Sequence, residues 1–257
     1  MSKEIVEPKQ ESLPMLSPEV VELLAQAAQT KADAEMVTTA VISLKNKRFT
    51  LNDIKLGTSL DVVILADAHE HAYYDKPYDP DVISPPACFA INTVHADMKP
   101  EPDKWFIPLP QAEKCQGCPL DEFGTARQGK GKACRNGRRL LVAAVSNGKA
   151  NLKDLAVINI PPTSLKSFSR YVKQITTSKK LPLWAVVTNF EFDDDSAYPI
   201  LVPSCIGGVS GEDINEIAQS LVEYEKQILT PYDCTAWVPS ASVEEVAAST
   251  AKKSKMS

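Results

Sequence analysis

The sequence predicts an α+β fold with a β-rich core, and three observations lead to this. Apolar runs of strand length recur along the chain, whereas helical periodicity is confined to three segments. Proline is frequent, at 19 residues, and glycine is modest, at 10, which favours many short elements joined by rigid turns. With 257 residues and 44% apolar content, the chain fits one large domain or one domain with a sizeable insertion.

Both ends of the chain are expected to lie outside this core. Residues 1–16 combine two prolines with mixed charge and predict a disordered arm. A helix begins next, because Ser17 can serve as its N-cap, with Pro18 at the first helical position. It ends near residue 34, and residues 240–257 predict a flexible tail.

The first strands follow this helix. Residues 37–44 and 48–51 flank a short polar turn, which indicates a hairpin. Residues 60–65 form a buried strand. Residues 69–74 continue it with polar and aromatic side chains, which suggests a strand that runs out to an exposed surface.

Residues 76–139 form an insertion with little periodicity. It is rich in proline and carries four of the six cysteines. A stretch of this length without regular structure is uncommon in a compact domain unless something else orders it. A bound metal ion would do so.

Regular patterns return after the insertion and complete a single domain over residues 17–239. The predicted strands cover 138–145, 155–160, 183–192 and 198–205. The predicted helices cover 165–175, with Ser164 in its capping segment, and 212–228.

The cysteine spacing predicts one structural zinc ion. Cys115 and Cys118 stand two residues apart, and Cys134 follows after fifteen more. Two such thiolates can bind one metal from a tight turn, for which Gly117 is suited. Cys88 is the best fourth ligand. His95 is the alternative, and His69 and His71 are weaker ones.

Other roles for these thiols are less consistent with the sequence. A thioredoxin-like redox pair would open a helix after a strand, whereas these cysteines have polar, proline-bounded flanks. Buried thiols with no common function are a further alternative. A catalytic zinc needs an open position and a general base, and no such set is recognisable, so we expect no enzymatic activity.

Basic residues are concentrated although the net charge is −5. Residues 114–139 hold seven basic and two acidic side chains, and residues 164–180 hold five basic and no acidic ones. Aromatic residues are interleaved with them, a combination typical of proteins that bind single-stranded nucleic acid. The expected phosphate contacts are Lys130, Lys132, Arg135, Arg138 and Arg139, and the expected stacking residues are Tyr73, Tyr74 and Phe123.

Several of these segments resemble a group of tailed-phage proteins described as single-stranded DNA-binding proteins. The resemblance covers about residues 37–205 and includes Cys88 after Pro86, the Cys115–Cys118 pair, and Cys134 after Gly129 and Gly131. The layout is also similar to zinc-containing phage single-strand binders. It implies an OB-like barrel core that carries a zinc-bearing loop insertion, with flanking helices. The Lys-rich C-terminus departs from the acidic tail of better-known members.

This resemblance implies a non-enzymatic protein of a phage-type replication or recombination system, with single-stranded DNA as its partner. Replication or recombination proteins and an oligomeric state are further possibilities. The alternative is a structural or assembly protein of the virion type, with a domain stiffened by zinc. No apolar run reaches the length of a bilayer span and the N-terminus lacks an apolar signal core, so we expect the cytoplasm, that of the host cell if phage-encoded, and no membrane partner.

Overall fold

The structure is a computed structural model that describes residues 39–52, 54–77, 85–101 and 110–230. All of them belong to one compact unit that begins at Thr39. The predicted arm, the helix expected from Ser17, the tail and parts of the insertion lie outside the described residues.

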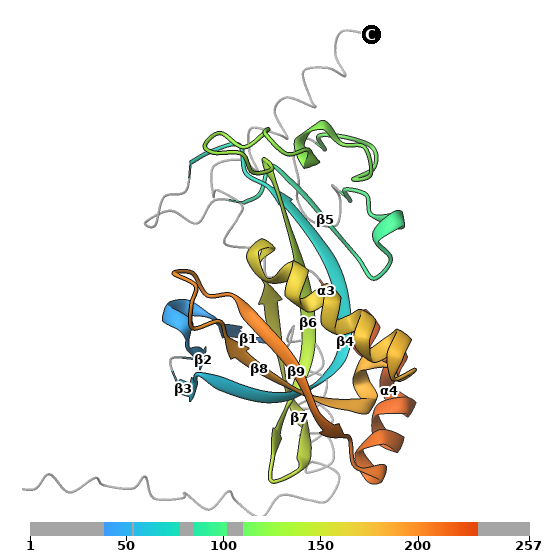
Figure 1. The fold of residues 1–257 in the computed structure, drawn as a ribbon. Helices are drawn as coiled ribbons and strands as arrows, with labels where there is room; N and C mark the ends of the chain where they lie inside the picture. The colour runs from blue at the N-terminus through green and yellow to red at the C-terminus, as the bar shows by residue number, and fades with distance from the viewer. Residues whose placement is uncertain (1–38, 53, 78–84, 102–109, 231–257) are drawn as a thin grey trace, which may run out of the picture. The chain divides into compact units, whose positions relative to one another are not determined.

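The described residues form a single mixed sheet with helices on both faces (Figure 1). Its strands are β1 (Ala40–Ser43), β2 (Phe49–Leu51), β3 (Ile54–Gly57), β4 (Ser59–Tyr73), β5 (Cys88–Asn92), β6 (Cys134–Ser146), β7 (Lys149–Ile160), β8 (Val186–Phe192) and β9 (Leu201–Gly208). The order is β3-β2-β1-β7-β6-β4-β8-β9, with β5 paired to β4. The β1–β7 pair is parallel and the other pairs are antiparallel.

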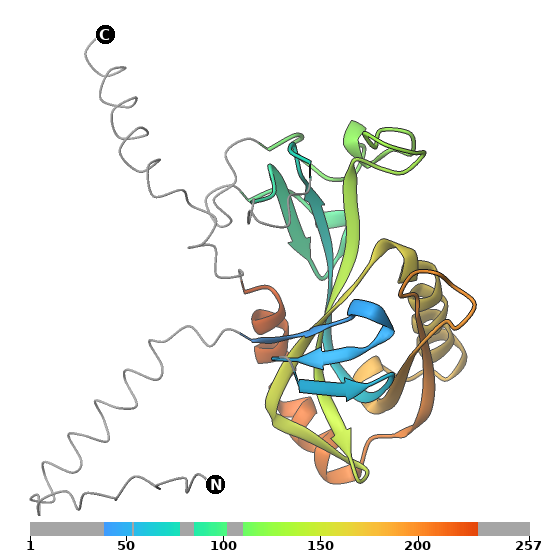
Figure 2. The ribbon, with the colours of Figure 1, turned by 90° about the vertical axis from the view of Figure 1, so that its left-hand side faces the viewer.

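The sheet is strongly curled into a half-barrel (Figure 2). The rings of Phe49 on β2 and Phe192 on β8 pack at a tilt of 33° with centroids 4.7 Å apart, although several strands separate them in the sheet order. The ammonium group of Lys47 closes the same side by donating to the backbone carbonyl of Asp193. This curl encloses an apolar core and confirms the α+β, β-rich prediction.

The long strand β4 organises the sheet. Its first part pairs with β8, most of its length pairs with β6, and its last residues pair with β5. A bulge between Ile64 and Ala66 increases the local twist, and it lies between the segment of β4 that pairs with β8 and the segment that pairs with β5. The polar, aromatic end continues the strand as the sequence predicts, but the predicted exposure is wrong for most of it. Strands β5 and β6 flank this end, His71 and Ala72 are buried, and of residues 69–74 only Tyr74 is exposed.

Two helices cover opposite faces of the sheet, which we call the α3 face and the α4 face (Figures 1 and 2). Helix α3 (Leu165–Lys173) continues into a π-helical turn (Gln174–Ser178) and packs Phe168 and Tyr171 on one apolar cluster. Helix α4 (Gly211–Ile228) packs Ile217 and Tyr224 on the other. Side chains alternate between these faces along each strand.

Several boundaries differ from the prediction. Strands β3 and β5 form where the sequence indicates none, and β7 begins at Lys149 rather than at residue 155. Strand β8 starts after a short 3₁₀ turn, Leu183–Ala185, and β9 starts at Leu201. Ser164 does not cap α3, because its hydroxyl accepts the Leu201 backbone N–H at 2.9 Å. The remaining 3₁₀ turns are Lys45–Lys47, His95–Asp97, Pro119–Asp121 and Pro162–Ser164.

Candidate functional site

Two of the four predicted cysteine ligands lie in one row across the sheet. In the register, Tyr73 of β4 stands opposite Cys88 of β5 on one side and Cys134 of β6 on the other. Directly opposed residues point to the same face of a sheet. The alternation that sends Leu140 to the α3 face also sends Cys134 there, so both thiols lie on the α3 face.

The other two cysteines come from a tight turn that packs over this row. The Cys118 N–H donates to the Cys115 carbonyl at 3.2 Å, and Gly117 between them has a φ of +80°. This backbone conformation favours glycine, and the turn agrees with the role expected for Gly117 from the sequence. The Cys115 N–H donates to the Met98 carbonyl at 3.0 Å and so fixes the turn beside β5.

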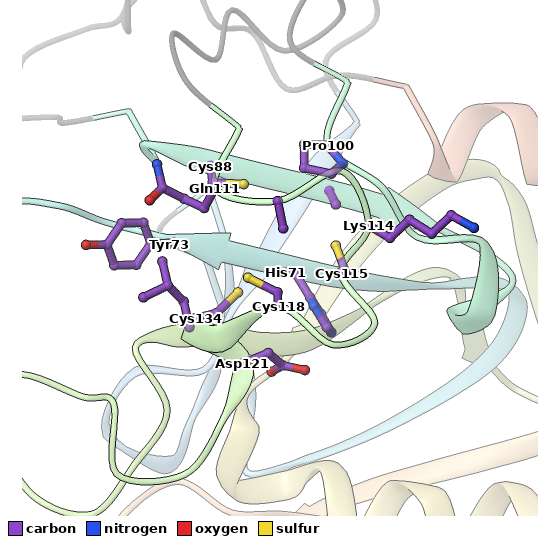
Figure 3. A pocket seen from close by; sticks show the side chains of 13 residues that line it. His71, Tyr73, Cys88, Pro100, Gln111, Lys114, Cys115, Cys118, Asp121 and Cys134 are labelled. Carbon is purple, nitrogen blue, oxygen red and sulfur yellow. The ribbon is translucent and has the colours of Figure 1, made fainter.

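All four cysteines line a single pocket, together with His71 and Asp121 (Figure 3). The structure thus brings together the residues that the sequence proposes as ligands, from two strands and a loop up to 46 positions apart. Within the described ranges, however, no three His, Cys, Asp or Glu side chains are grouped closely enough to hold a metal as they stand.

The thiols of Cys88, Cys115 and Cys134 in this pocket have raised pKa values, so they ionise less readily than free cysteine. The pKa of Cys115 is raised to about 12, mainly by burial and in addition by the neighbouring Cys88, Cys118 and Asp121. Burial and then Asp121 likewise raise the pKa of Cys134 to about 12, and burial raises that of Cys88. A divalent cation would reverse this, since it favours the thiolate form of each of them.

His71 lines this pocket, although the sequence suggests it only as a weak candidate ligand. Its side chain is only 4% exposed, and its Nδ1 atom has no hydrogen-bond partner within the described part of the chain. His95, the predicted alternative ligand, does not line the pocket; its ring packs against His71 with centroids 5.6 Å apart. The signal for His71 is the strand period, because it stands two residues before Tyr73 and shares its face.

The loop between Cys118 and Cys134 is ordered by its own hydrogen bonds. The Gly124 and Ala126 N–H groups donate to the Gly131 carbonyl at 2.8 and 3.1 Å. The Thr125 hydroxyl donates to the Glu122 carbonyl at 2.7 Å and accepts the Ala133 N–H. The loop is therefore a defined surface next to the cysteine pocket.

This loop presents an aromatic ring beside a cation. Phe123 is 82% exposed, and the Lys132 ammonium lies 5.3 Å from its ring centroid. Lys132 also pairs with Asp121 at 3.0 Å, and Lys130 is exposed on the same loop. An aromatic face that is bare to solvent and flanked by positive charge is suited to stacking of a base.

The structure gives Arg139 a role in the fold instead of at the surface. Its side chain is 3% exposed and lies 3.3 Å from the Glu70 carboxylate. It also donates to the carbonyls of Ile228 and Thr230 at the C-terminal end of α4. The predicted phosphate contact of Arg139 does not fit this burial.

Arg138 is also engaged within the protein. Its guanidinium pairs with Asp67 at 2.7 Å and lies 2.9 Å from the ring nitrogen of His69. It covers the ring of Phe168 at 5.6 Å from the centroid and so links β6 to α3.

The predicted stacking residues Tyr73 and Tyr74 separate onto opposite faces. Tyr73 lines the cysteine pocket, whereas Tyr74 is 44% exposed and lines a pocket of about 250 Å³ with Arg135 and Asn159. Gly137 contributes to this second pocket, where a Cβ atom would come within 3.2 Å of the Ile160 carbonyl. The predicted nucleic-acid residues therefore do not form one continuous patch.

Comparison with protein-family models, curated proteins and solved structures finds no match to this chain. In the described ranges, none of the helices has both the length and the apolar character needed to cross a bilayer.

Proposed function

We propose that this chain binds single-stranded DNA without enzymatic activity and that a zinc ion holds its basic loop in place. The observation that carries the proposal is the bare ring of Phe123 beside Lys132, on a loop whose two ends are the cysteines Cys118 and Cys134. Bases would stack on the ring while Lys130 and Lys132 meet phosphates. Of the other predicted residues, Arg135 and Tyr74 are exposed for peripheral contacts.

The residues around the cysteine pocket fit a zinc ion. Four thiols of the type that zinc prefers line it, one pair comes from a tight two-residue spacing, and the pocket also holds a buried histidine nitrogen without a described partner. We propose Cys88, Cys115, Cys118 and Cys134 as the ligands. The ion would cross-link β5, β6 and the loop between Cys118 and Cys134. We further propose that the curled sheet is an OB-type barrel and that the zinc site is part of its insertion.

The ligand proposal is tested by metal analysis of the purified protein and of single Cys→Ser variants at the four positions. We expect about one zinc per chain in the unmodified protein and loss of metal in each variant. Cys205→Ser is the matched control, since Cys205 lies on β9 away from the pocket and should leave the metal content unchanged. Iron with inorganic sulfide in place of zinc, or full zinc in a Cys88→Ser variant, would contradict the ligand proposal.

The DNA proposal is tested by anisotropy titration of labelled oligo(dT) at increasing salt. We expect binding that weakens steeply as salt rises. Because one stacked base contributes about 1 to 3 kcal/mol, Phe123→Ala should weaken binding about tenfold or more. It should leave the unfolding midpoint unchanged, since the ring is exposed. Absence of oligo(dT) binding at low salt would overturn the function.

A second candidate function is assembly, as in a virion-type structural protein. It is favoured by the strands at the two ends of the sheet order, because β3 exposes Ile54 and Leu56 and β9 exposes Val202 and Ile206. This function predicts a stable oligomer in sedimentation and indifference to DNA. The oligo(dT) titration therefore separates the two candidates.

A further inference from the structure

Helix α3 and the turn after it carry a run of cations that the contacts above do not use. Phe168, Tyr171 and Ile175 turn inward to the core, so the opposite side of this segment faces solvent. The residues on that side are Lys166, Arg170 and Lys173, at helical spacing, followed by Lys179 and Lys180. All five are exposed.

No carboxylate close in sequence neutralises these cations. Residues 161–190 contain no acidic side chain. Strand β9 packs against α3 and is uncharged along its whole length. Among the described residues, no ion pair involves any of the five. Fields of like charge without counter-charges are the signature of a surface that meets a polyanion.

This cationic surface lies on the same face of the sheet as the cysteine loop. Helix α3 covers the α3 face over the core, and the cysteine row lies on that face at the far end of β4 and β6 (Figures 1 and 2). Between them, the alternation of β4 places His69 and Asp67 on the same face. Arg138 contacts both of these residues and also Phe168 of α3.

We propose that the exposed side of α3 binds the phosphate backbone of the same DNA strand whose bases reach Phe123. The strand would run along the α3 face, from the loop between Cys118 and Cys134 to Lys166, Arg170 and Lys173. This inference rests on the proposed single-strand function. It adds a second contact region and a course for the DNA strand between the two regions. The exposed ring on the loop supplies base contacts, and α3, with no exposed aromatic side chain, supplies charge alone.

The test is a triple variant, Lys166→Gln, Arg170→Gln and Lys173→Gln, titrated with oligo(dT) of about 16 nucleotides, the upper range of one such domain. Each single-strand phosphate contact contributes about 0.7 to the slope of log affinity against log salt. We expect the slope to become shallower by about 2 and the affinity at low salt to fall about tenfold or more. With an oligonucleotide of about 4 nucleotides, which can cover the loop alone, the triple variant should bind as the unmodified protein does.

The matched control replaces three other exposed lysines that are in none of the ion pairs of the described residues, Lys45→Gln, Lys55→Gln and Lys153→Gln. It should bind like the unmodified protein, which shows that position and not net charge matters. If the unmodified protein binds and the α3 variant binds equally well with the same salt slope, the α3 path is wrong although the function stands. An acidic protein partner would then be the remaining ligand for this surface. If the unmodified protein itself does not bind, both the function and the path fail.

Discussion

At the scale of single residues, the neighbouring arginines Arg138 and Arg139 connect β6 to two different helices. Arg138 and Arg139 point to opposite faces of β6, where the first links to α3 and the second to the end of α4. The free carbonyls at a helix C-terminus carry partial negative charge, so a buried guanidinium there is stabilising. Glu70 supplies the full counter-charge that this buried cation requires.

Replacement of Arg139 should therefore destabilise the protein. An Arg139→Leu variant removes the buried cation that faces Glu70 and the donor to the carbonyls of Ile228 and Thr230. We expect a loss of about 3 kcal/mol in the free energy of unfolding, measured by urea denaturation. Arg135→Leu, four residues earlier and exposed, is the control and should change stability by less than about 0.5 kcal/mol. Equal effects of the two substitutions would contradict this role of Arg139.

The lowered pKa of His69 should make the stability of the protein depend on pH. Burial, followed by the charge of Arg138, lowers its pKa to about 4 in the folded protein, against 6.5 for the free side chain. The unfolded chain therefore binds a proton that the folded chain does not, and stability should fall as the pH drops from about 6.5 toward 4. Because the ring is partly solvated, we expect a loss of about 1 to 2 kcal/mol.

The measurement is urea denaturation at several pH values between 7.5 and 5, where most carboxylates stay ionised. His69→Gln should flatten the dependence, while His95→Gln serves for comparison, since that ring packs on the same cluster. Stability that rises on acidification through this range would show that the ring is protonated in the folded state.

At the scale of elements, β4 and α4 show what the sequence can and cannot predict. The continuation of β4 past residue 69 is predicted from its residue types and α4 from its apolar period, but the predicted exposure of the β4 end is wrong, because β5 and β6 cover it. Strand β5 is not predicted, because five residues between prolines carry too short a pattern; pairing with β4 creates it. The grouping of the four cysteines in one pocket is predicted from the Cys115–Cys118 spacing and the cysteine-rich insertion. The burial of Arg139 depends instead on a contact with α4 across 89 positions that no local pattern records.

The start of α4 provides a test at this scale. The Ser210 hydroxyl accepts the Asp213 N–H at 3.2 Å, and Glu212 and Asp213 add negative charge to the first turn. Ser210→Ala should reduce the free energy of unfolding by about 1 kcal/mol, measured by urea denaturation. Ser210→Asp should retain most of it, because a carboxylate accepts the same hydrogen bond. Loss of stability in both variants would argue against the capping role.

At the scale of the whole molecule, the half-barrel and the cysteine end differ in what stabilises them. The half-barrel has two apolar clusters with large aromatic and aliphatic side chains, so it is held by burial. At the cysteine end, Phe89 and Ile91 of β5 join one of these clusters, whereas on the pocket side the described residues form a small cluster of Ala90, Met98 and Cys115. Burial alone stabilises this end little, which is the situation in which a structural metal contributes most.

Metal removal should therefore loosen one end and spare the other. With a strong chelator, amide hydrogens of residues 110–133 should exchange much faster, while those of β6 and β7 within the core remain protected. Hydrogen exchange followed by mass spectrometry measures both regions in one sample. Readdition of zinc should restore protection of the loop. Global loss of protection would show that the metal supports the entire fold, and no change would show that it supports neither part.

The long β4 strand has a consequence for synthesis of the chain. Its partners β5 and β6 and the cysteine loop all lie within residues 59–146, whereas β8 joins it from about 130 positions away, as in the bond between Asn189 and Asp61. Contacts of such separation form late. The cysteines therefore leave the ribosome while the strands that close the half-barrel are still untranslated. If they bind zinc as proposed, they could do so on the newborn chain, and zinc supply in the cell would act before folding is complete.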